Sequence, residues 1–365
     1  MEKNQLQAAR ETIDRIDRDM AALFEARMAA VAQVADHKKK NGLPIFDPER
    51  EDAVVAKNTT YIQDESLRPF YVEFMRDTMK VSRQYQRKML TGMEVAYSGI
   101  EGAFAAIATH KIFPDAHGNP YPDFGSAYAA VEKGECDVAV LPMENSTAGE
   151  VGQVIDLMYA GSLVVTGVYS LSVRHCLMGL PEAELSDITR VTSHPQALMQ
   201  CAPFIEARRF ETVEATNTAL AARAVAEGGD PTVAAIASEE TAELYGLKIL
   251  APNINETILN TTRFAVLARA GEARVNTGKH FILLFTVRNE AGFLARAINV
   301  IGDHGYNMRC LRSRPMKDLL WQYYFYAELE GDLETENGRE MLADLSQYCE
   351  KLKVVGSFAD TTALN

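Results

Sequence analysis

The feature that most constrains the fold is an unbroken stretch with helical periodicity at the start of the chain. Residues 5–40 contain neither Gly nor Pro, and at 1.5 Å per residue they form a helix about 54 Å long. Its apolar side chains recur at helical spacing, at Leu6, Ile13, Ile16, Met20, Leu23, Val31 and Val34. A helical region of roughly 90 residues is too small to cover this stripe by itself. We therefore expect a second copy of the chain to cover it, in a homodimer or a dimer of dimers.

Residues 1–90 are expected to form an all-helical region of three helices. Asn41-Gly42-Leu43-Pro44 ends the long helix, because Gly and Pro stop helices. Asp47 followed by Pro48 is typical of an N-cap and a first helical residue, so a second helix is expected to run to about residue 60. A third helix is expected over residues 66–89.

The charge of the chain excludes a general nucleic-acid or membrane-surface function. Its 365 residues hold 37 Lys and Arg against 50 Asp and Glu, a net charge of −13, and a polyanionic surface repels such a chain. At about 100–200 residues per domain, the length indicates two or three domains. Residues 1–90 carry 16 basic and 15 acidic side chains, so this region differs from the acidic remainder.

Cysteine usage and hydropathy predict a soluble cytoplasmic protein. The five cysteines are far apart and include no C-x-x-C pair, which predicts reduced thiols and no zinc site. The N-terminus lacks the apolar segment of a signal peptide, and no apolar run reaches about 18 residues. We expect no membrane partner.

From residue 93 to residue 270 the pattern changes to short apolar runs that alternate with helical stretches. The runs lie at 95–97, 137–141, 162–168, 190–192, 233–237 and 263–267. This alternation predicts an α/β domain, and its length is enough for two lobes with a cleft between them.

A polar stretch at 269–279, which we interpret as a linker, precedes a compact unit at 278–365. Its expected order is strand 280–287, helix 292–304, strand 308–315, strand 320–330, helix 336–349 and strand 352–358. The order predicts a small βαββαβ sandwich of the α+β class.

Basic side chains accompany the apolar stripe of the first helix. Arg27 and Lys38 are 11 residues apart, which places them within about 20° of one another around the helix. Arg10 precedes Arg27 by 17 residues and faces about 100° away, so in an antiparallel dimer it can reach the partner's site. Ordinary solvated surface charge is the alternative interpretation of these cations.

The first region resembles the all-helical chorismate mutases found at the front of bifunctional P-proteins. The resemblance rests on the spacing of Arg10, Arg27, Lys38, Asp47, Arg50, Glu51, Ser82 and Gln86. It implies that Arg27 and Arg10 of the partner subunit bind the substrate carboxylates. It also implies that Lys38 and Gln86 donate to the ether oxygen and that Glu51 holds the hydroxyl. Rearrangement of chorismate to prephenate needs a held conformer and a stabilised ether oxygen, and no nucleophile.

Four short motifs in the middle region resemble those of prephenate dehydratases. They are Pro-Met-Glu-Asn-Ser at 142–146, Ser-His-Pro-Gln at 193–196, Ala-Thr-Asn-Thr-Ala at 215–219 and Asn-Thr-Thr-Arg-Phe at 260–264. The resemblance extends over 93–270 and implies a two-lobed domain similar to periplasmic binding proteins. Dehydratases convert prephenate to phenylpyruvate with loss of water and carbon dioxide. The reaction requires a proton for the departing hydroxide and a site for two carboxylates.

The same resemblance implies that Thr262 assists the departing hydroxyl, with Arg263 beside it. A Thr is too weak an acid to act alone, so we expect a donor or relay; a strand Thr with a local hydrogen bond is the alternative. Groups at helix N-termini are expected to bind the carboxylates, at Asn145, Ser146, Thr147 and Thr218. We interpret His194 as part of a helix start capped by Ser193.

One segment departs from the dehydratase pattern. The usual Gly-Pro-x-Gly-Thr-Phe-Ser after the first strand is Gly-Ile-Glu-Gly-Ala-Phe-Ala here, so the methyl groups of Ala103 and Ala105 replace two hydroxyls. If those hydroxyls bind substrate, each lost hydrogen bond costs about 0.5–1.5 kcal/mol. A middle domain that binds an aromatic acid without converting it therefore remains open.

The last region resembles an ACT domain, a small unit that binds amino acids at a dimer interface. The resemblance rests on residues 290–294 and 312–315. It implies L-phenylalanine as effector, bound at Ala291, Gly292, Phe293, Leu294, Ser313, Arg314 and Pro315. The Glu that usually precedes Ser-Arg-Pro is Arg312 here. A purely structural dimer domain is the alternative.

Together, these resemblances predict an enzyme of L-phenylalanine biosynthesis that converts chorismate to prephenate and prephenate to phenylpyruvate, with feedback inhibition by L-phenylalanine. No cofactor or metal is expected. The alternatives are a mutase joined to an arogenate dehydratase, whose substrate carries an amine, or to a non-catalytic binding domain.

Overall fold

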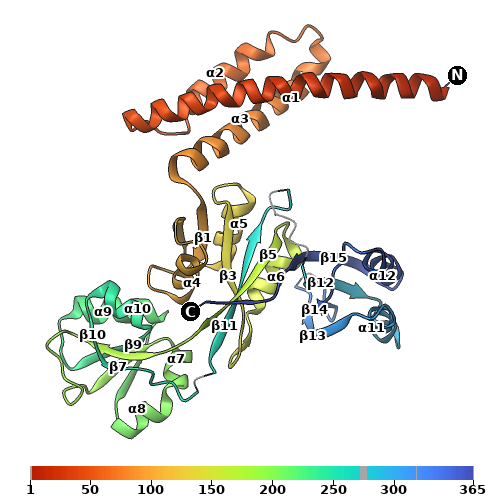
Figure 1. The fold of residues 1–365 in the computed structure, drawn as a ribbon. Coiled ribbons are helices and arrows are strands. Elements are labelled where there is room, and N and C mark those ends of the chain that lie inside the picture. The colour runs from red at the N-terminus through yellow and green to blue at the C-terminus, as the bar shows by residue number, and fades with distance from the viewer. Residues whose placement is uncertain (1, 258, 272–277, 318, 365) are drawn as a thin grey trace. The chain divides into compact units, whose positions relative to one another are not determined.

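The computed structural model describes residues 2–257, 259–271, 278–317 and 319–364 (Figure 1). The chain divides into two compact units, one ending at Met93 and one beginning at Glu94. No described helix is both long and apolar enough to cross a membrane.

The first unit is all-helical, as predicted. It contains α1 (Glu2–Asn41), α2 (Pro48–Thr59), the 3-10 turn η1 (Glu65–Leu67) and α3 (Arg68–Thr91). Asp47 caps α2, because its carboxylate accepts a hydrogen bond of 3.0 Å from the backbone N–H of Arg50. Gly42 follows α1 at φ 63°, a conformation that glycine adopts without strain.

Within one copy, this unit buries little apolar surface. Its buried apolar residues include a cluster of Val55, Met75 and Met79 between α2 and α3, together with Ala35 of α1. The stripe of α1 remains largely exposed: Ile13 is 56% and Leu23 is 69% accessible. An apolar stripe of this length left in water is typical of a surface that another chain covers.

The second unit begins with a lobe built on a seven-stranded sheet, which we call lobe 1. Its path is β16-β5-β11-β3-β1-β2, with β4 paired to β3. The strands are β1 (Glu94–Ser98), β2 (His117–Tyr121), β3 (Val138–Asn145), β4 (Gly149–Glu150), β5 (Val164–Ser172), β11 (Thr261–Ala268) and β16 (Thr362–Leu364). Its helices are α4 (Phe104–Ile112), α5 (Phe124–Glu132) and α6 (Gly152–Ala160). The sheet is mixed, because β11 runs antiparallel to β3 and β5.

A second lobe, lobe 2, has its own five-stranded sheet in the order β10-β6-β9-β7-β8. The strands are β6 (Cys176–Gly179), β7 (Arg190–Ser193), β8 (Glu211–Glu214), β9 (Val233–Ala237) and β10 (Lys248–Ala251). The helices are α7 (Pro195–Gln200), α8 (Ala202–Arg208), α9 (Thr218–Gly228) and α10 (Glu239–Tyr245). The chain enters lobe 2 after β5 and returns through β11. Separate sheets with separate cores confirm the predicted two-lobed layout.

The predicted βαββαβ order is also confirmed. It consists of β12 (His280–Val287), α11 (Phe293–Asp303), β13 (Asn307–Pro315), β14 (Tyr323–Glu330), α12 (Glu336–Ser346) and β15 (Cys349–Phe358). The antiparallel sheet has the order β13-β14-β12-β15. We call residues 280–358 the C-terminal sandwich.

The sheet of the C-terminal sandwich is covered on both faces. Phe281 and Leu329 face a core shared with α11 and α12. On the other face, Leu284, Tyr324 and Tyr326 belong to the same core as lobe 1. After β15 the chain returns to lobe 1, where β16 pairs in parallel with β5. Lobe 1 and the sandwich are therefore packed against each other through a continuous apolar core.

Local structure departs from the predictions where the sequence lacks periodicity. The strands β2, β4, β6, β8, β10 and β16 were not among the predicted runs. Asn145-Ser146-Thr147 does not open a helix: it ends β3 and turns into β4, and α6 begins only at Gly152. Within the expected linker at 269–279, residues 272–277 lie outside the described part of the chain.

Candidate functional site

In the helical unit, several of the residues predicted for the mutase site lie close together. The guanidinium of Arg27 donates from Nη1 to the Ser82 hydroxyl, which in turn donates to the carbonyl of Thr78 at 2.7 Å. Ser82 and Gln86 lie one turn apart on α3 and are only 5% and 7% exposed. The Gln86 Oε1 atom is buried without a hydrogen-bond partner among the described residues. This buried oxygen can accept a hydrogen bond from a ligand.

The remaining predicted mutase residues surround the start of α2. Lys38 Nζ donates to the Ile45 carbonyl at 2.5 Å. Glu51 is ion-paired through its carboxylate to Arg83 Nη1, and the Arg83 guanidinium lies 5.0 Å from the centre of the Phe46 ring. Arg83 was missed in the sequence, because nothing in its spacing separates it from other helical cations. Arg50 is exposed.

Arg10 is not joined to this cluster within one copy. It is exposed on the first turns of α1, and the 17 residues that separate it from Arg27 correspond to about 26 Å of helix. If Arg10 acts with Arg27, the two must come from different copies of the chain.

The second unit contains a cavity of about 380 Å³ between its lobes. Its polar lining consists of Asn145, His175, His194, Gln196, Gln200, Asn217, Thr218 and Thr262. Its apolar lining consists of Ala103, Phe104, Ala105, Phe124, Pro142, Val151, Val173, Ala197 and Phe264. Of the predicted dehydratase residues, the cavity thus brings together Asn145, Thr218 and Thr262. Ala103 and Ala105 present methyl groups there, and Ala103 leaves α4 without a side-chain cap.

A directed chain of hydrogen bonds crosses from lobe 2 to Thr262. Gln200 Nε2 donates to Thr147 Oγ1 at 2.9 Å, and Thr147 Oγ1 donates to Asn145 Oδ1 at 2.7 Å. Asn145 Nδ2 donates to Thr262 Oγ1 at 3.0 Å. Since the Thr262 oxygen accepts in this chain, its own proton is left for another acceptor, and the described residues supply none.

His175, Gln200 and Asn260 extend this network and were missed in the sequence. Gln200 Oε1 accepts from Asn260 Nδ2 at 2.9 Å and lies 3.0 Å from His175 Nε2. Burial lowers the pKa of His175, although its hydrogen bond to Gln200 acts in the opposite direction. The ring is therefore neutral near pH 7, with its proton on Nε2, the atom facing the amide oxygen. Asn260 lies in the motif at 260–264 but was not singled out, and no local motif marks His175 or Gln200; the three meet only through the tertiary fold.

Two helix N-termini lie at the cavity. Thr218 is the first residue of α9, whose cap Asn217 accepts from the backbone N–H of Leu220 at 2.7 Å. The start of α4, at Phe104, is the other. Helix N-termini favour bound anions through their free N–H groups and dipole. The predicted cap of α7 was wrong by one residue: His194 caps it, since Ser193 Oγ donates instead to the Ile236 carbonyl.

Three predicted dehydratase residues do not line the cavity. Ser146 holds the turn after β3 to β11, donating to the Leu259 carbonyl at 2.8 Å and accepting from Thr261 N at 3.0 Å. Thr147 contributes indirectly, because its hydroxyl accepts from Gln200 and donates to Asn145. Arg263 lies on the opposite face of β11 from Thr262, because successive strand residues point to opposite faces. There it pairs with Glu144 and with Glu328 of the C-terminal sandwich.

The predicted effector residues fall on two sides of the sandwich sheet. Gly292 adopts φ 85° before α11, with Ala291, Phe293 and Leu294 around it. Arg314 lies on the face toward lobe 1, where it pairs with Glu150 and Asp156. Ser313 and Pro315 are its neighbours on β13. One copy therefore does not join the Gly292 turn to the Arg314 guanidinium, whose charge is already balanced by two carboxylates.

Two family models match the chain. Chorismate mutase type II matches residues 9–87, and prephenate dehydratase matches residues 95–272. The bifunctional chorismate mutase/prephenate dehydratase of Neisseria gonorrhoeae is 33% identical over 356 residues, which cover 96% of this chain and 95% of that protein.

Solved structures match about three quarters of the chain, 73% in each of two cases. Prephenate dehydratase from Arthrobacter aurescens in complex with L-Phe is 27% identical, with a TM-score of 0.68, over 73% of this chain and 90% of that one. GqqA, described as a novel type of quorum quenching acylase, is 32% identical, with a TM-score of 0.67, over 73% of this chain and 97% of that one. Matching family models in both units and near-complete coverage of a bifunctional relative place the whole chain in one family. It belongs to the bifunctional chorismate mutase/prephenate dehydratases.

Proposed function

We propose that the helical unit rearranges chorismate to prephenate and that the two-lobed part of the second unit converts prephenate to phenylpyruvate. The observation that carries the second assignment is the directed hydrogen-bond chain that leaves the Thr262 proton available in the cavity. The first rests on the cluster of Arg27 with the buried Ser82 and Gln86.

In the helical unit, the substrate is a dianion and the reaction is a single pericyclic step. Arg27 binds one carboxylate, and Lys38 Nζ and Gln86 Nε2 donate to the ether oxygen as the bond to it breaks, whereas Gln86 Oε1, unpartnered among the described residues, can only accept. Fixed cations and a buried amide favour the transition state because they need no reorganisation when charge develops. Glu51, held by Arg83, is positioned to accept from the substrate hydroxyl.

In the second unit, prephenate must lose carbon dioxide and hydroxide, and the hydroxide must receive a proton. We assign the N-termini of α4 and α9 to the two carboxylates, since these termini present free N–H groups at the cavity. Thr262 donates toward the leaving hydroxyl. Its ordinary acidity is far too weak for complete proton transfer, so it serves as a hydrogen-bond donor, and the departing hydroxide takes its proton from solvent, with aromatisation of the ring as the driving force.

We propose that a second copy covers α1 and supplies Arg10. The exposed stripe on α1, the distance between Arg10 and Arg27, and the exposed α3 side chains of Phe70 and Phe74 support this arrangement. In an antiparallel pair, each mutase site then contains Arg27 of one chain and Arg10 of the partner subunit.

Mixing two inactive variants tests the shared site. Arg10→Ala and Arg27→Ala chains each lose mutase activity alone. When they are unfolded together and refolded, about half of the dimers contain one chain of each kind, and each of these has one intact site. The recovered mutase rate per chain should approach about a quarter of the parent rate. With one variant isotopically labelled so that mixed dimers can be identified by mass, no recovery despite mixed dimers would show that both arginines belong to the same copy's site.

We propose that the C-terminal sandwich is an ACT domain that senses L-phenylalanine. The supporting features are its βαββαβ order and the left-handed Gly292 at the N-terminus of α11. Phe293 lies between Arg288 and Arg296, whose guanidinium carbons are 5.5 Å and 5.1 Å from its ring centre. The effector site is completed across a dimer interface. We place the protein in the cytoplasm, where its five free cysteines stay reduced.

Supplying chorismate alone tests the complete proposal. The purified chain should form prephenate and then phenylpyruvate, and L-phenylalanine should suppress phenylpyruvate formation. Accumulation of prephenate without phenylpyruvate would mean that the replacement of two hydroxyls by the methyl groups of Ala103 and Ala105 has abolished dehydratase activity. A parallel assay with arogenate tests the related substrate, because a rate above that for prephenate would reassign the second site. Binding of prephenate without turnover would favour the non-catalytic alternative.

A further inference from the structure

The strands that carry Asn145 and Thr262 present charged side chains on their other face. In the register of β3 and β11, Thr262 lies opposite Asn145, and Arg263 lies opposite Glu144. Since side chains alternate along a strand, the first pair faces the cavity and the second faces away from it. Glu144 and Arg263 therefore stand directly behind the two residues that end the hydrogen-bond chain.

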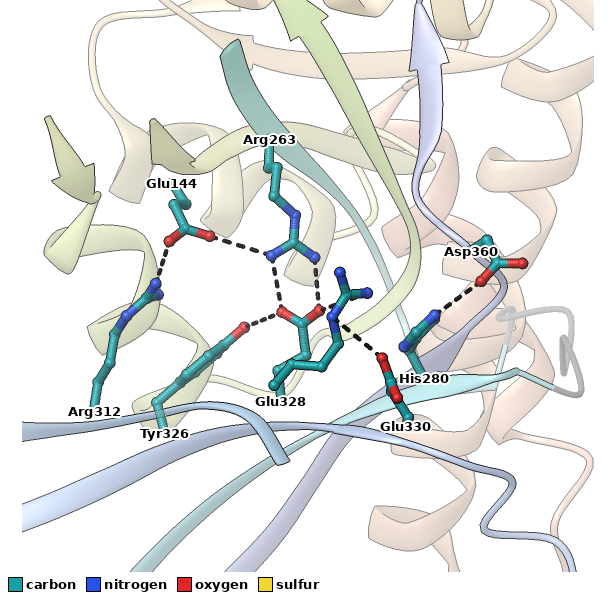
Figure 2. Close-up of polar contacts among 9 residues, drawn as sticks. Glu144, Arg263, His280, Arg312, Tyr326, Glu328, Glu330 and Asp360 are labelled. Atoms are coloured by element: carbon teal, nitrogen blue, oxygen red, sulfur yellow. Dashed lines mark hydrogen bonds and ion pairs between the residues drawn. The ribbon is translucent and has the colours of Figure 1, made fainter. Parts of the chain in front are cut away.

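The face behind the cavity is covered by the sheet of the C-terminal sandwich (Figure 2). On β14, Tyr324, Tyr326 and Glu328 alternate toward lobe 1, whereas Phe325 and Ala327 face α11 and α12. Glu328 is thus a carboxylate in the middle of an apolar face and is 1% exposed. A carboxylate at such a position requires a positive partner.

Arg263 of lobe 1 is that partner. Its Nη2 lies 2.8 Å from Glu328 Oε1, and its Nη1 lies 2.9 Å from Glu328 Oε2, a two-pronged contact. Nη1 also donates to Glu144 Oε2 at 3.2 Å, and Arg312 of β13 donates to the other Glu144 oxygen. Burial disfavours the charge on Arg263, but the attraction of Glu328 prevails and raises the pKa of Arg263, which stays charged.

Further contacts show that the sandwich is anchored firmly enough to act as a support. Arg314 pairs with Asp156 at 2.9 Å beside Tyr324, whose hydroxyl donates to the same carboxylate at 2.6 Å. Lys353 of β15 donates to the Met158 carbonyl at the end of α6 at 2.6 Å. A Cβ at Gly356 would meet the Val165 carbonyl oxygen at 2.1 Å, so β15 and β5 approach too closely for any side chain there.

We propose that Glu328 is a positioning residue for the dehydratase site: by holding Arg263 from the sandwich side, it fixes the part of β11 that presents Thr262. The inference rests on the proposed dehydratase function. Arg312 acts in the same way on β3, through Glu144 behind Asn145. The sandwich therefore supports the site mechanically, and a shift of its sheet moves the two strands that carry the donor.

The test compares Glu328→Gln with Glu330→Gln in the full-length chain. Glu330 is the control, because it lies two residues along the same strand and contacts Arg309 and Asn307 of the sandwich itself. Arg309 also lies 4.0 Å from Glu328 Oε1, so Glu330→Gln shows what the loss of a carboxylate beside Arg309 does when the Arg263 contact is kept. We expect Glu328→Gln to lower the dehydratase kcat roughly 10- to 100-fold, since small displacements of a reacting group have effects of this size. KM for prephenate and the mutase rate should change little, and hydrogen exchange of the β11 amides should accelerate. Glu330→Gln should match the parent in all four measurements.

A second variant separates positioning from loss of folding. The double change Arg263→Met and Glu328→Met removes both charges together, so no buried charge is left unpaired. We expect it to unfold cooperatively as the parent does, yet to have a similarly reduced kcat. An active parent with unchanged kcat in Glu328→Gln, or in the folded double variant, would overturn this inference alone. A parent chain that forms no phenylpyruvate from prephenate would overturn the proposed function, and the inference with it.

Discussion

Replacing Thr262 with alanine is expected to reduce phenylpyruvate formation by about 100- to 1,000-fold, the range found when a positioned hydrogen-bond donor to a developing negative charge is removed. Thr262 is only 9% exposed, lines the cavity, and is the last member of a chain whose other bonds all point toward its oxygen. Its removal leaves Asn145 Nδ2 without that acceptor and the departing hydroxyl without its donor. The measurement is the initial rate of phenylpyruvate formation from prephenate.

Two further variants control this prediction. Thr262→Ser keeps a hydroxyl at the same place and should retain much of the rate. Thr261→Ala changes the adjacent residue, which is not part of the cavity lining and holds the turn through its backbone; it should behave like the parent. The mutase rate of each variant reports on the integrity of the other unit. A Thr262→Ala rate within about threefold of the parent would remove Thr262 from the chemistry.

Replacing Arg27 with alanine is expected to lower the mutase rate by about 100- to 1,000-fold and to leave the dehydratase rate unchanged. Arg27 contacts the buried Ser82 hydroxyl and belongs to the same cluster as Gln86. Its loss removes a fixed positive charge that the substrate dianion needs in both ground and transition states. Arg27→Lys should recover only part of the rate, since an ammonium cannot reproduce the two-pronged contact of a guanidinium with a carboxylate.

Arg18→Ala is the matched control for this change. Arg18 is exposed on the same helix, nine residues before Arg27, and therefore lies about 180° around the axis from it. Its removal should leave both reactions near the parent rates. If Arg27→Ala reduced both reactions together, the assignment of separate sites to the two units would be wrong, provided that the variant keeps the oligomeric state of the parent.

Helices and strands could be predicted where apolar side chains recur at a regular spacing or form a continuous run in the sequence. The strand at 280–287 was placed at its observed bounds because all eight of its side chains are buried, and α1 was recognised from a stripe without Gly or Pro. By contrast, β8 has four exposed residues and β16 has only three residues. Such strands exist because a neighbouring strand offers free N–H and C=O groups, and a single sequence does not reveal that neighbour.

The candidate site was predictable in its residue types and only partly in its arrangement. Short motifs located Asn145 and Thr262, but the contact between residues 117 positions apart depends on the pairing of β3 with β11. Gln200 and His175 were missed since polar residues outside those motifs carry no local signal. Arg263 was expected beside Thr262 as a substrate ligand, yet strand alternation directs it to the sandwich.

The sequence by itself predicted the long first helix and the main strands from local periodicity, and its short motifs, by resemblance to known families, predicted the two reactions and some of the residues that line the cavity. Only the tertiary structure decided which of these residues meet. It directed Arg263 and Arg314 into the contact between lobe 1 and the C-terminal sandwich, and it connected Gln200 to Thr262 across the two lobes. The physical reason is that such contacts depend on strand register and sheet packing, which bring together segments that the chain separates by a hundred residues or more.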